Sequence, residues 1–162
     1  MLKERIQIDV KEALKAGDAL KRTALGMIMS AIKNKELEKR SKLSKTESDT
    51  AKLEELSMLS DEEVIEVLSS EIKKRRESAE IYEKGGRPEL AEAEKKEIDF
   101  LMAYMPEQMS EDQIREEVKR TISEVGASSI KDMGKAIGAV MAKIKGKADG
   151  QIVSRIVKEE LS

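Results

Sequence analysis

The sequence has no cysteine, no histidine and no tryptophan, and its 162 residues include only two tyrosines and one phenylalanine. Without cysteine there is no disulfide, no thiolate metal ligand and no cysteine nucleophile. Without histidine, a Ser-His-Asp triad, a histidine general base and a histidine-ligated zinc are excluded. Lysine, tyrosine and carboxylate side chains could still transfer protons, but no cluster of them stands out. We therefore expect a protein that binds, with no catalytic centre, metal or cofactor of its own.

Long apolar runs are also missing, so the sequence predicts no transmembrane span, no signal peptide and no membrane partner. Together with the absence of cysteine, this favours a cytoplasmic protein. Three aromatic residues are too few for a stacking platform that binds single-stranded nucleic acid. The formal net charge of −2 argues against indiscriminate binding of nucleic acid but leaves room for local basic patches.

Helix-forming residues dominate what remains, because Lys, Glu, Ala and Leu are abundant and few stretches favour strands. The prediction is an all-α fold with a region of long helices followed by a three-helix subdomain. Gly17 ends a first helix and Asp18 caps a second, which we expect to run to about Arg40. The buried stripes expected on these two helices consist of Leu2, Ile6, Val10, Ala13 and Leu14, then Leu20, Ala24, Met27, Ile28, Ala31 and Ile32.

The polar stretch 41–60 is rich in serine and threonine and predicts a mobile linker, with a short helix around 50–56. Ser60 and Glu63 then form a capping box that begins a long helix, and Gly85-Gly86 ends that helix. Pro88 suits the first turn of the next helix. The dipeptide Met105-Pro106 is the best candidate boundary, because proline disfavours helical geometry in the residue before it. We therefore divide the chain into 1–105 and 106–162.

Three amphipathic helices are expected in 106–162. A second capping box at Ser110 begins the first of them, and Gly126 ends it. Ser129 caps the next helix, and a turn over 145–150 leads to the last one. Such short helices are marginal alone and must pack together. The stripe expected to be buried on the middle helix consists of Ile130, Met133, Ile137, Val140 and Ile144.

The glycines and lysines of the middle helix and the turn after it are the first candidate site. Gly134 and Gly138 lie on one helix face, although each glycine costs a helix about 1 kcal/mol relative to alanine. Lys143, Lys145 and Lys147 gather positive charge beside a glycine-rich turn, which attracts phosphate. From spacing alone, tight helix packing with solvated lysines is the favoured alternative. The pattern does not match a nucleotide-binding P-loop.

Two other features favour structural roles. The cationic run at residues 73–76 has glutamates within helical reach, so we interpret it as a solvated stripe and not as a phosphate-binding face. The segment 82–88, which carries Tyr82 and Arg87, is interpreted as a turn between helices with the tyrosine at the edge of the core, and Tyr104 is interpreted in the same way.

Three segments carry a family resemblance: EIKKRRESAEIYEKGGRPELAEAEKKEIDFL, AYMPEQMSEDQI and GASSIKDMGKAIGAVMAKIKGKADGQIVSRIV. They closely resemble the GatB/YqeY family over nearly the whole chain, and MGKAIGAVMAKIKGKADG is the most specific part. The resemblance implies an all-α stand-alone protein whose last three helices are similar to the tail of the B subunit of tRNA-dependent Asp/Glu amidotransferase. In that subunit the tail helps to hold tRNA, while the kinase and amidase chemistry lie in other domains.

The resemblance implies a tRNA-binding role for eleven positions, namely Met133, Gly134, Lys135, Gly138, Lys143, Lys145, Gly146, Lys147, Ala148, Asp149 and Gly150. One departure bears on this set. Ala142 stands where family members commonly carry proline, so the helix could run further and displace the lysine turn. A second departure is the stretch 41–60, which looks longer than usual.

The leading functional hypothesis is a tRNA-associated binding module, an accessory to tRNA-dependent amidation with an aminoacyl-tRNA synthetase or amidotransferase subunits as partners. One alternative is a carbon–nitrogen ligase component that uses glutamine as amide donor and is active only with partner subunits. The chain itself lacks a Ser-Ser-Lys amidase signature and the ATP-binding half of the B subunit. The other alternative is a helical adaptor that binds proteins and no RNA.

Overall fold

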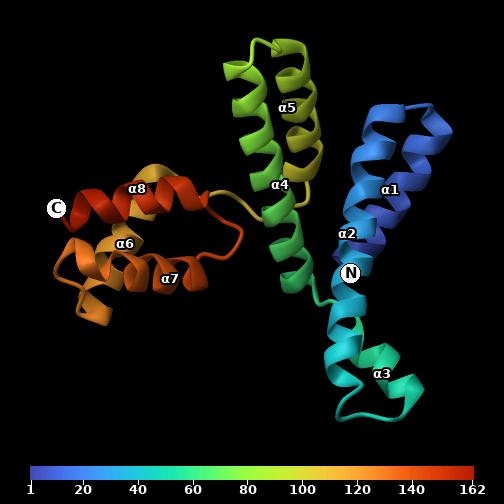
Figure 1. Cartoon of the computed structure of the whole chain (residues 1–162), viewed down its shortest axis with the longest axis horizontal. Coiled ribbons are helices and arrows are strands. Elements are labelled where there is room, and N and C mark those ends of the chain that lie inside the picture. The colour runs from blue at the N-terminus through green and yellow to red at the C-terminus, as the bar shows by residue number, and fades with distance from the viewer. The chain divides into compact units, whose positions relative to one another are not determined.

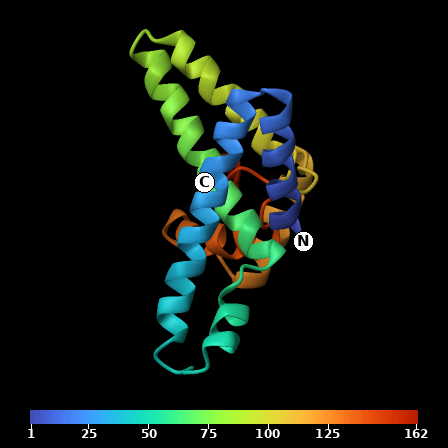
Figure 2. The same cartoon turned by 90° about the vertical axis from the view of Figure 1, so that its right-hand side faces the viewer.

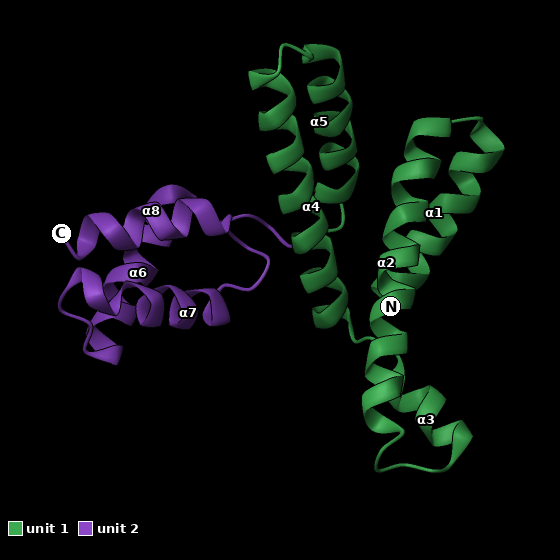
Figure 3. Ribbon diagram, in the orientation of Figure 1, with its two compact units in different colours: residues 1–104 green, residues 105–162 purple.

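A computed structural model describes all 162 residues, and its regular elements are all helical (Figure 1). The all-α prediction is confirmed. The chain forms two compact units, Met1–Tyr104 and Met105–Ser162 (Figure 3). No helix is long and apolar enough to cross a membrane.

Unit 1 consists of two helical hairpins (Figures 1 and 2). Helix α1 packs against α2, and α4 packs against α5, while α2 also contacts α4 and α5. A short helix, α3, lies between the two hairpins in the order of the chain and packs against α2. The bounds are α1 Leu2–Ala16, α2 Ala19–Leu43, α3 Thr50–Ser57, α4 Asp61–Lys84 and α5 Pro88–Met102.

The helix ends of unit 1 follow the local signals in the sequence. Gly17 ends α1 in the left-handed region with φ of 71°, where a side chain would be strained. The Asp18 carboxylate accepts a hydrogen bond from the Lys21 amide at 3.0 Å and begins α2. Ser60 and Glu63 form the predicted capping box of α4, and Pro88 is the first residue of α5. These short-range predictions are confirmed because each depends on residues within one helical turn.

The stretch 41–60, which we expected to be a mobile linker with a short helix, contains the end of α2 and the helix α3. Helix α2 continues to Leu43, and α3 occupies Thr50–Ser57, close to the short helix predicted there. The Asp49 carboxylate begins α3 by accepting hydrogen bonds from the amides of Ala51 and Lys52. Leu59 is buried. Most residues of α3 are exposed, which accounts for the polar composition of this stretch. Leu59 provides a buried apolar contact in the connection from α3 to α4.

Several residues expected in buried stripes are exposed. Leu14 is 59 % exposed and Leu20 is 38 % exposed, and the two residues flank the α1–α2 turn. Met27 is 52 % exposed. Each helix of a hairpin is covered on only part of its circumference, so the contacting strip is narrower than the apolar stripe in the sequence. The interior residues of the same stripes, Ile6, Ala13, Ala24, Ile28 and Ile32, are buried as predicted.

The cationic run at residues 73–76 is only partly a solvated stripe. The side chains of Lys73 and Lys74 are 70 % and 66 % exposed. The Arg75 side chain is only 5 % exposed and forms ion pairs with Glu71 at 2.9 Å and with Glu97 of α5 at 3.0 Å. For Arg75 the expectation of a solvated side chain is therefore wrong. Glu97 lies on another helix, so this pairing is not visible in helical spacing along α4.

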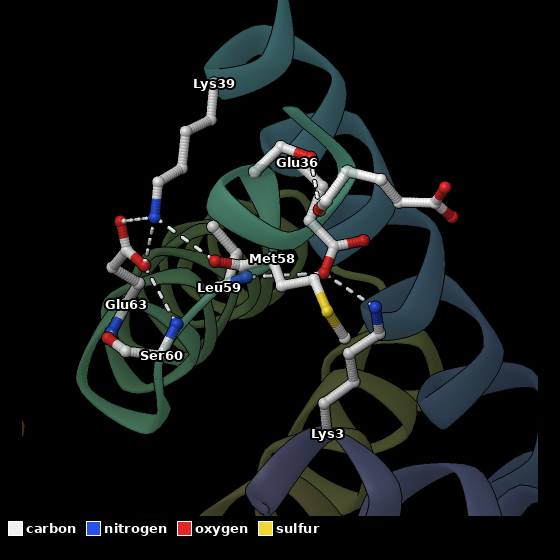
Figure 4. Close-up of polar contacts among 9 residues, drawn as sticks. Lys3, Glu36, Lys39, Met58, Leu59, Ser60 and Glu63 are labelled. Atoms are coloured by element: carbon white, nitrogen blue, oxygen red, sulfur yellow. Dashed lines mark hydrogen bonds and ion pairs between the residues drawn. The ribbon is translucent and has the colours of Figure 1, made fainter. Parts of the chain in front are cut away.

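A second buried charge, on Glu36, connects three segments of unit 1 (Figure 4). Glu36 of α2 is 6 % exposed. Its carboxylate accepts a hydrogen bond from the Lys3 ammonium at 2.6 Å and one from the Leu59 amide at 3.4 Å. One side chain thus joins α2 to the start of α1 and to the connection between α3 and α4.

Unit 2 consists of three α-helices and one 3-10 turn around an aliphatic core. Its elements are α6 Glu111–Val125, the 3-10 turn η1 Ile130–Asp132, α7 Met133–Lys143 and α8 Gly150–Glu160. Ser110 forms the predicted capping box of α6, and Gly126 ends that helix with φ of 66°. The buried core consists of Ile114, Val118, Ala136, Val140, Ile144, Val153, Ile156 and Val157.

The buried Arg75 generates a stability prediction. In Arg75→Ala the carboxylates of Glu71 and Glu97 lose their shared partner, and we expect the free energy of unfolding to fall by about 3 kcal/mol, the low end for a broken buried ion pair because Glu71 keeps Lys74 as a partner. Lys73→Ala removes one charge from the same run at an exposed position and should change it by less than about 0.5 kcal/mol. Urea unfolding followed by helical circular dichroism measures both. Equal stability of the two variants would contradict a structural role for the buried guanidinium.

Candidate functional site

The residues singled out by the resemblance lie on α7, on the turn that joins α7 to α8 and at the first residue of α8. Helix α7 begins at Met133 after the 3-10 turn, in which the Ser129 hydroxyl donates a hydrogen bond to the Asp132 carboxylate at 3.3 Å. The Asp132 carboxylate accepts hydrogen bonds from the amides of Ser128 and Ser129, which lowers its pKa. It is therefore ionised at neutral pH and already bound to backbone amides.

The two glycines of α7 lie on an open face. Gly134 and Gly138 are exposed, and a Cβ built on either one would meet no atom within 4 Å. Ala142 is exposed one turn further along. Close packing between helices within the chain, the alternative left open above, is therefore not the reason for these glycines.

Ile130 is 51 % exposed, although we expected it in the buried stripe of this helix. It belongs to the 3-10 turn and not to α7. The tighter repeat of a 3-10 turn places its side chains at different angles from those of an α-helix, so the α-helical register fails there.

The lysines of the site differ in what they contact. The Lys143 ammonium bonds to Glu124 and lies 3.4 Å from Glu117, both on α6. The hydrogen bond that Lys143 donates to the Glu124 carboxylate raises the pKa of Lys143, which keeps it charged and paired. The Lys135 ammonium donates to the Val125 carbonyl at 2.8 Å, at the end of α6. Lys147 is exposed and forms no ion pair.

The α7–α8 turn is held from the segment that precedes α6. Gly146 has φ of 70°, a conformation that favours glycine. The Gln108 side-chain amide donates to the Gly146 carbonyl at 2.7 Å, and the Met109 amide donates to the Lys147 carbonyl at 2.8 Å. Sequence reasoning missed Gln108 and Met109, because they lie 38 residues before their partners in the chain.

The remaining positions of the set serve the fold of unit 2. Met133 and Ala148 are partly buried and pack against the core. The Asp149 carboxylate caps α8 by accepting from the Gln151 amide at 2.7 Å. A Cβ on Gly150 would meet only the Met141 methyl group, at 3.8 Å, which is ordinary contact.

Helix α7 ends at Lys143, one residue after Ala142. Ala142 therefore lies inside the last turn of α7. The helix does not run on into the lysine turn.

Charge in unit 2 is balanced in total but unevenly distributed. Residues 105–162 contain ten basic and ten acidic side chains. The segment 131–147 holds five of the lysines and a single acid, Asp132, which is bound to backbone amides. The exposed face of α7 and the following turn are consequently the cationic part of a neutral unit.

The glycines generate opposite stability predictions within this one site. Gly146→Ala places a side chain at positive φ and should lower the free energy of unfolding by about 1–2 kcal/mol. Gly138→Ala lies in a helix with open space around it and should raise that free energy by about 1 kcal/mol. Hydrogen exchange of the α8 amides reports the stability of unit 2 directly. Shifts in the same direction for the two variants would show that the turn conformation is misassigned.

Comparison with known proteins identifies the family. The chain is 30 % identical over 99 residues to "Altered inheritance of mitochondria protein 41, mitochondrial" of Candida glabrata, an alignment that covers 61 % of this chain and 47 % of the relative. It is 26 % identical over 137 residues to the protein of the same name from Clavispora lusitaniae, covering 83 % of this chain and 69 % of the relative. The chain thus spans from about half to about two thirds of these relatives. A family model described as "Yqey-like protein" matches residues 3–161, and the chain therefore belongs to the YqeY-like protein family.

Proposed function

We propose that unit 2 binds tRNA, with the exposed glycine face of α7 and the turn 145–147 as the contact surface. The observation that carries the proposal is the open, glycine-bearing face of α7 within a cationic segment. Gly134 and Gly138 each weaken the helix by about 1 kcal/mol, and no contact inside the chain compensates for this. An external partner that approaches the helix backbone closely supplies a reason for both.

The electrostatics favour a polyanion as that partner. Lys131 and Lys147 are exposed, form no ion pairs, and lie near the two ends of the cationic segment. Their ammonium groups can contact phosphates, while the glycines leave space for the sugar–phosphate backbone between them. Contacts of this kind recognise the shape of an RNA and not its base sequence. The three aromatic residues of the chain all lie in unit 1, so base stacking plays no part at this surface.

The resemblance of this unit to the tail of the amidotransferase B subunit supports tRNA as the polyanion. We include in the proposal an accessory role in tRNA-dependent amidation, with amidotransferase subunits or an aminoacyl-tRNA synthetase as protein partners. The names of the relatives refer only to inheritance of mitochondria and to a mitochondrial location. The cytoplasmic location of this chain stays a prediction.

The glycine face provides a test in which stability and affinity should move in opposite directions. The double variant Gly134→Ala, Gly138→Ala should be more stable than wild type, yet its affinity for unfractionated tRNA should fall about tenfold, because two methyl groups hold the backbones apart. Gly26→Ala is a matched control, since Gly26 also lies in a helix with open space around it. Filter binding measures the affinities. Unchanged affinity of the double variant would remove the glycine face from the interface.

The lysines provide a second test, through the salt dependence of binding. If wild type neutralises about three phosphates, log K should fall with log salt with a slope of roughly −2 to −3. The variant Lys131→Gln, Lys145→Gln, Lys147→Gln should lose most of that slope. Lys143 is left in place because it is paired with α6.

The control variant Lys119→Gln, Arg120→Gln, Lys158→Gln removes the same charge from α6 and α8, and it should keep the wild-type slope. Equal slopes for the two triple variants would mean that net charge alone, and not this surface, attracts tRNA. Absence of salt-sensitive tRNA binding in wild type would favour the adaptor hypothesis.

A further inference from the structure

Unit 1 contains a groove that the tRNA hypothesis does not use. It lies between α2 and the first half of α4 and has a volume of about 640 Å³. Helix α2 contributes residues from Ala31 to Lys42 at spacings of three and four, so one face of that helix forms a wall about 17 Å long. Helix α4 contributes the opposite wall, from Glu63 to Lys74, with the same spacing. The groove is thus a straight channel about three helical turns long.

The two walls carry opposite charge above a narrow apolar floor. The α2 wall has three lysines and one acid, whereas the α4 wall has three glutamates and one lysine. Ala31, Leu59 and Val67 provide the apolar surface between the walls. Most of these charges are paired, Lys35 with Glu38 at 3.2 Å and Lys74 with Glu71 at 2.6 Å. The net charge of the lining residues is nevertheless positive on the α2 wall and negative on the α4 wall.

The end of the groove nearest the start of α4 is fixed by a bridge between the walls (Figure 4). The Lys39 ammonium lies 2.8 Å from both carboxylate oxygens of Glu63 and 3.2 Å from the Met58 carbonyl. The hydrogen bond from Lys39 lowers the pKa of Glu63, and a second one from the Ser60 amide lowers it further. The bridge holds α2 and α4 at a set separation and stays charged at neutral pH.

Helix α1 lies on another face of α2. Lys3 of α1 bonds to Glu36, and these two residues line a smaller hollow together with Lys33 and Arg40, none of which lines the groove. The Leu2 amide also donates to the Asp61 carboxylate at the start of α4, at 2.8 Å. Near the start of α4, α1 therefore links α2 to α4. The groove lies on a different face of α2.

From these features we infer that the groove is a docking site for one amphipathic α-helix of a partner protein. That helix carries a narrow apolar stripe, acidic residues on the flank that faces the α2 wall, and basic residues on the flank that faces the α4 wall. It would pack against α2 and α4 as a further member of a helical bundle. The groove offers no free strand edge, so the side chains alone select the partner.

The charge pattern excludes the obvious rival occupants. A nucleic acid would bring phosphates against the acidic wall of α4, which repels them. A small-molecule site is usually concave and mostly apolar with few polar groups, whereas eight charged side chains line this groove. A partner helix with flanks of opposite charge matches the net charge of both walls at once.

The test uses the full-length protein and a displayed library of eighteen-residue helical peptides. Each peptide has leucine along one stripe, and its flanking positions vary among Glu, Lys, Gln and Ala. Selection on wild type should enrich peptides with acids on one flank and bases on the other. Enrichment of the same charge on both flanks, or no enrichment, would overturn the inference.

Two charge-matched variants then locate the binding. Lys35→Glu, Lys42→Glu reverses the α2 wall and should weaken the selected peptides at least tenfold. Lys33→Glu, Arg40→Glu makes the same charge change on the face of α2 away from the groove, and it should leave their affinity within twofold. Thermal unfolding followed by circular dichroism checks that both variants are folded at the temperature of the binding measurement, because Lys33 and Arg40 lie beside the buried Glu36. Equal affinity for the two variants would place the peptides elsewhere on the protein and overturn the inference.

Discussion

The packing of one aliphatic stripe per helix against a neighbouring helix is the constraint on which the structure depends. The chain has few aromatic residues, and Tyr104 is the one aromatic residue in the buried core, so the contacts bury mainly medium-sized side chains such as Leu25, Ile28 and Leu68. Each stripe covers one side of its helix, and the other sides carry the charged residues that make up 40 % of the chain. Charged residues at the edge of a stripe become buried where two helices pack against each other there. Arg75 and Glu36 are buried for this reason, and both are fully paired.

The same constraint shapes the candidate site in unit 2. The core face of α7 presents Ala136 and Val140 to α6 and α8, and the opposite face is left to Gly134, Gly138 and lysines. Two acids of this part of the chain serve as helix caps, since Asp132 and Asp149 bind backbone amides. The segment 131–147 still holds five lysines against the single acid Asp132. A unit with no net charge can consequently present one cationic surface.

The two proposed surfaces follow different electrostatic rules. The α7 surface has one sign of charge and no internal partner at its glycines, which suits a repeating polyanion. The groove in unit 1 has opposite charges on opposite walls, which suits a protein helix with two charged flanks. Together they would let one chain hold a tRNA with unit 2 and a protein with unit 1, a combination that an accessory factor requires.

The sequence by itself determined the helical class, the caps at Asp18, Ser60 and Ser110, the glycine stops, and the interior residues of each stripe. These depend on spacing within a few turns, which the order of residues specifies directly. Only the tertiary structure decided that Arg75 is buried by Glu97, that Leu14 and Ile130 are exposed, and that Lys143 is paired with α6. It also decided that the face of α7 around Gly134 and Gly138 is open. Those outcomes depend on which helix lies opposite, and residues far apart in the chain meet only through packing.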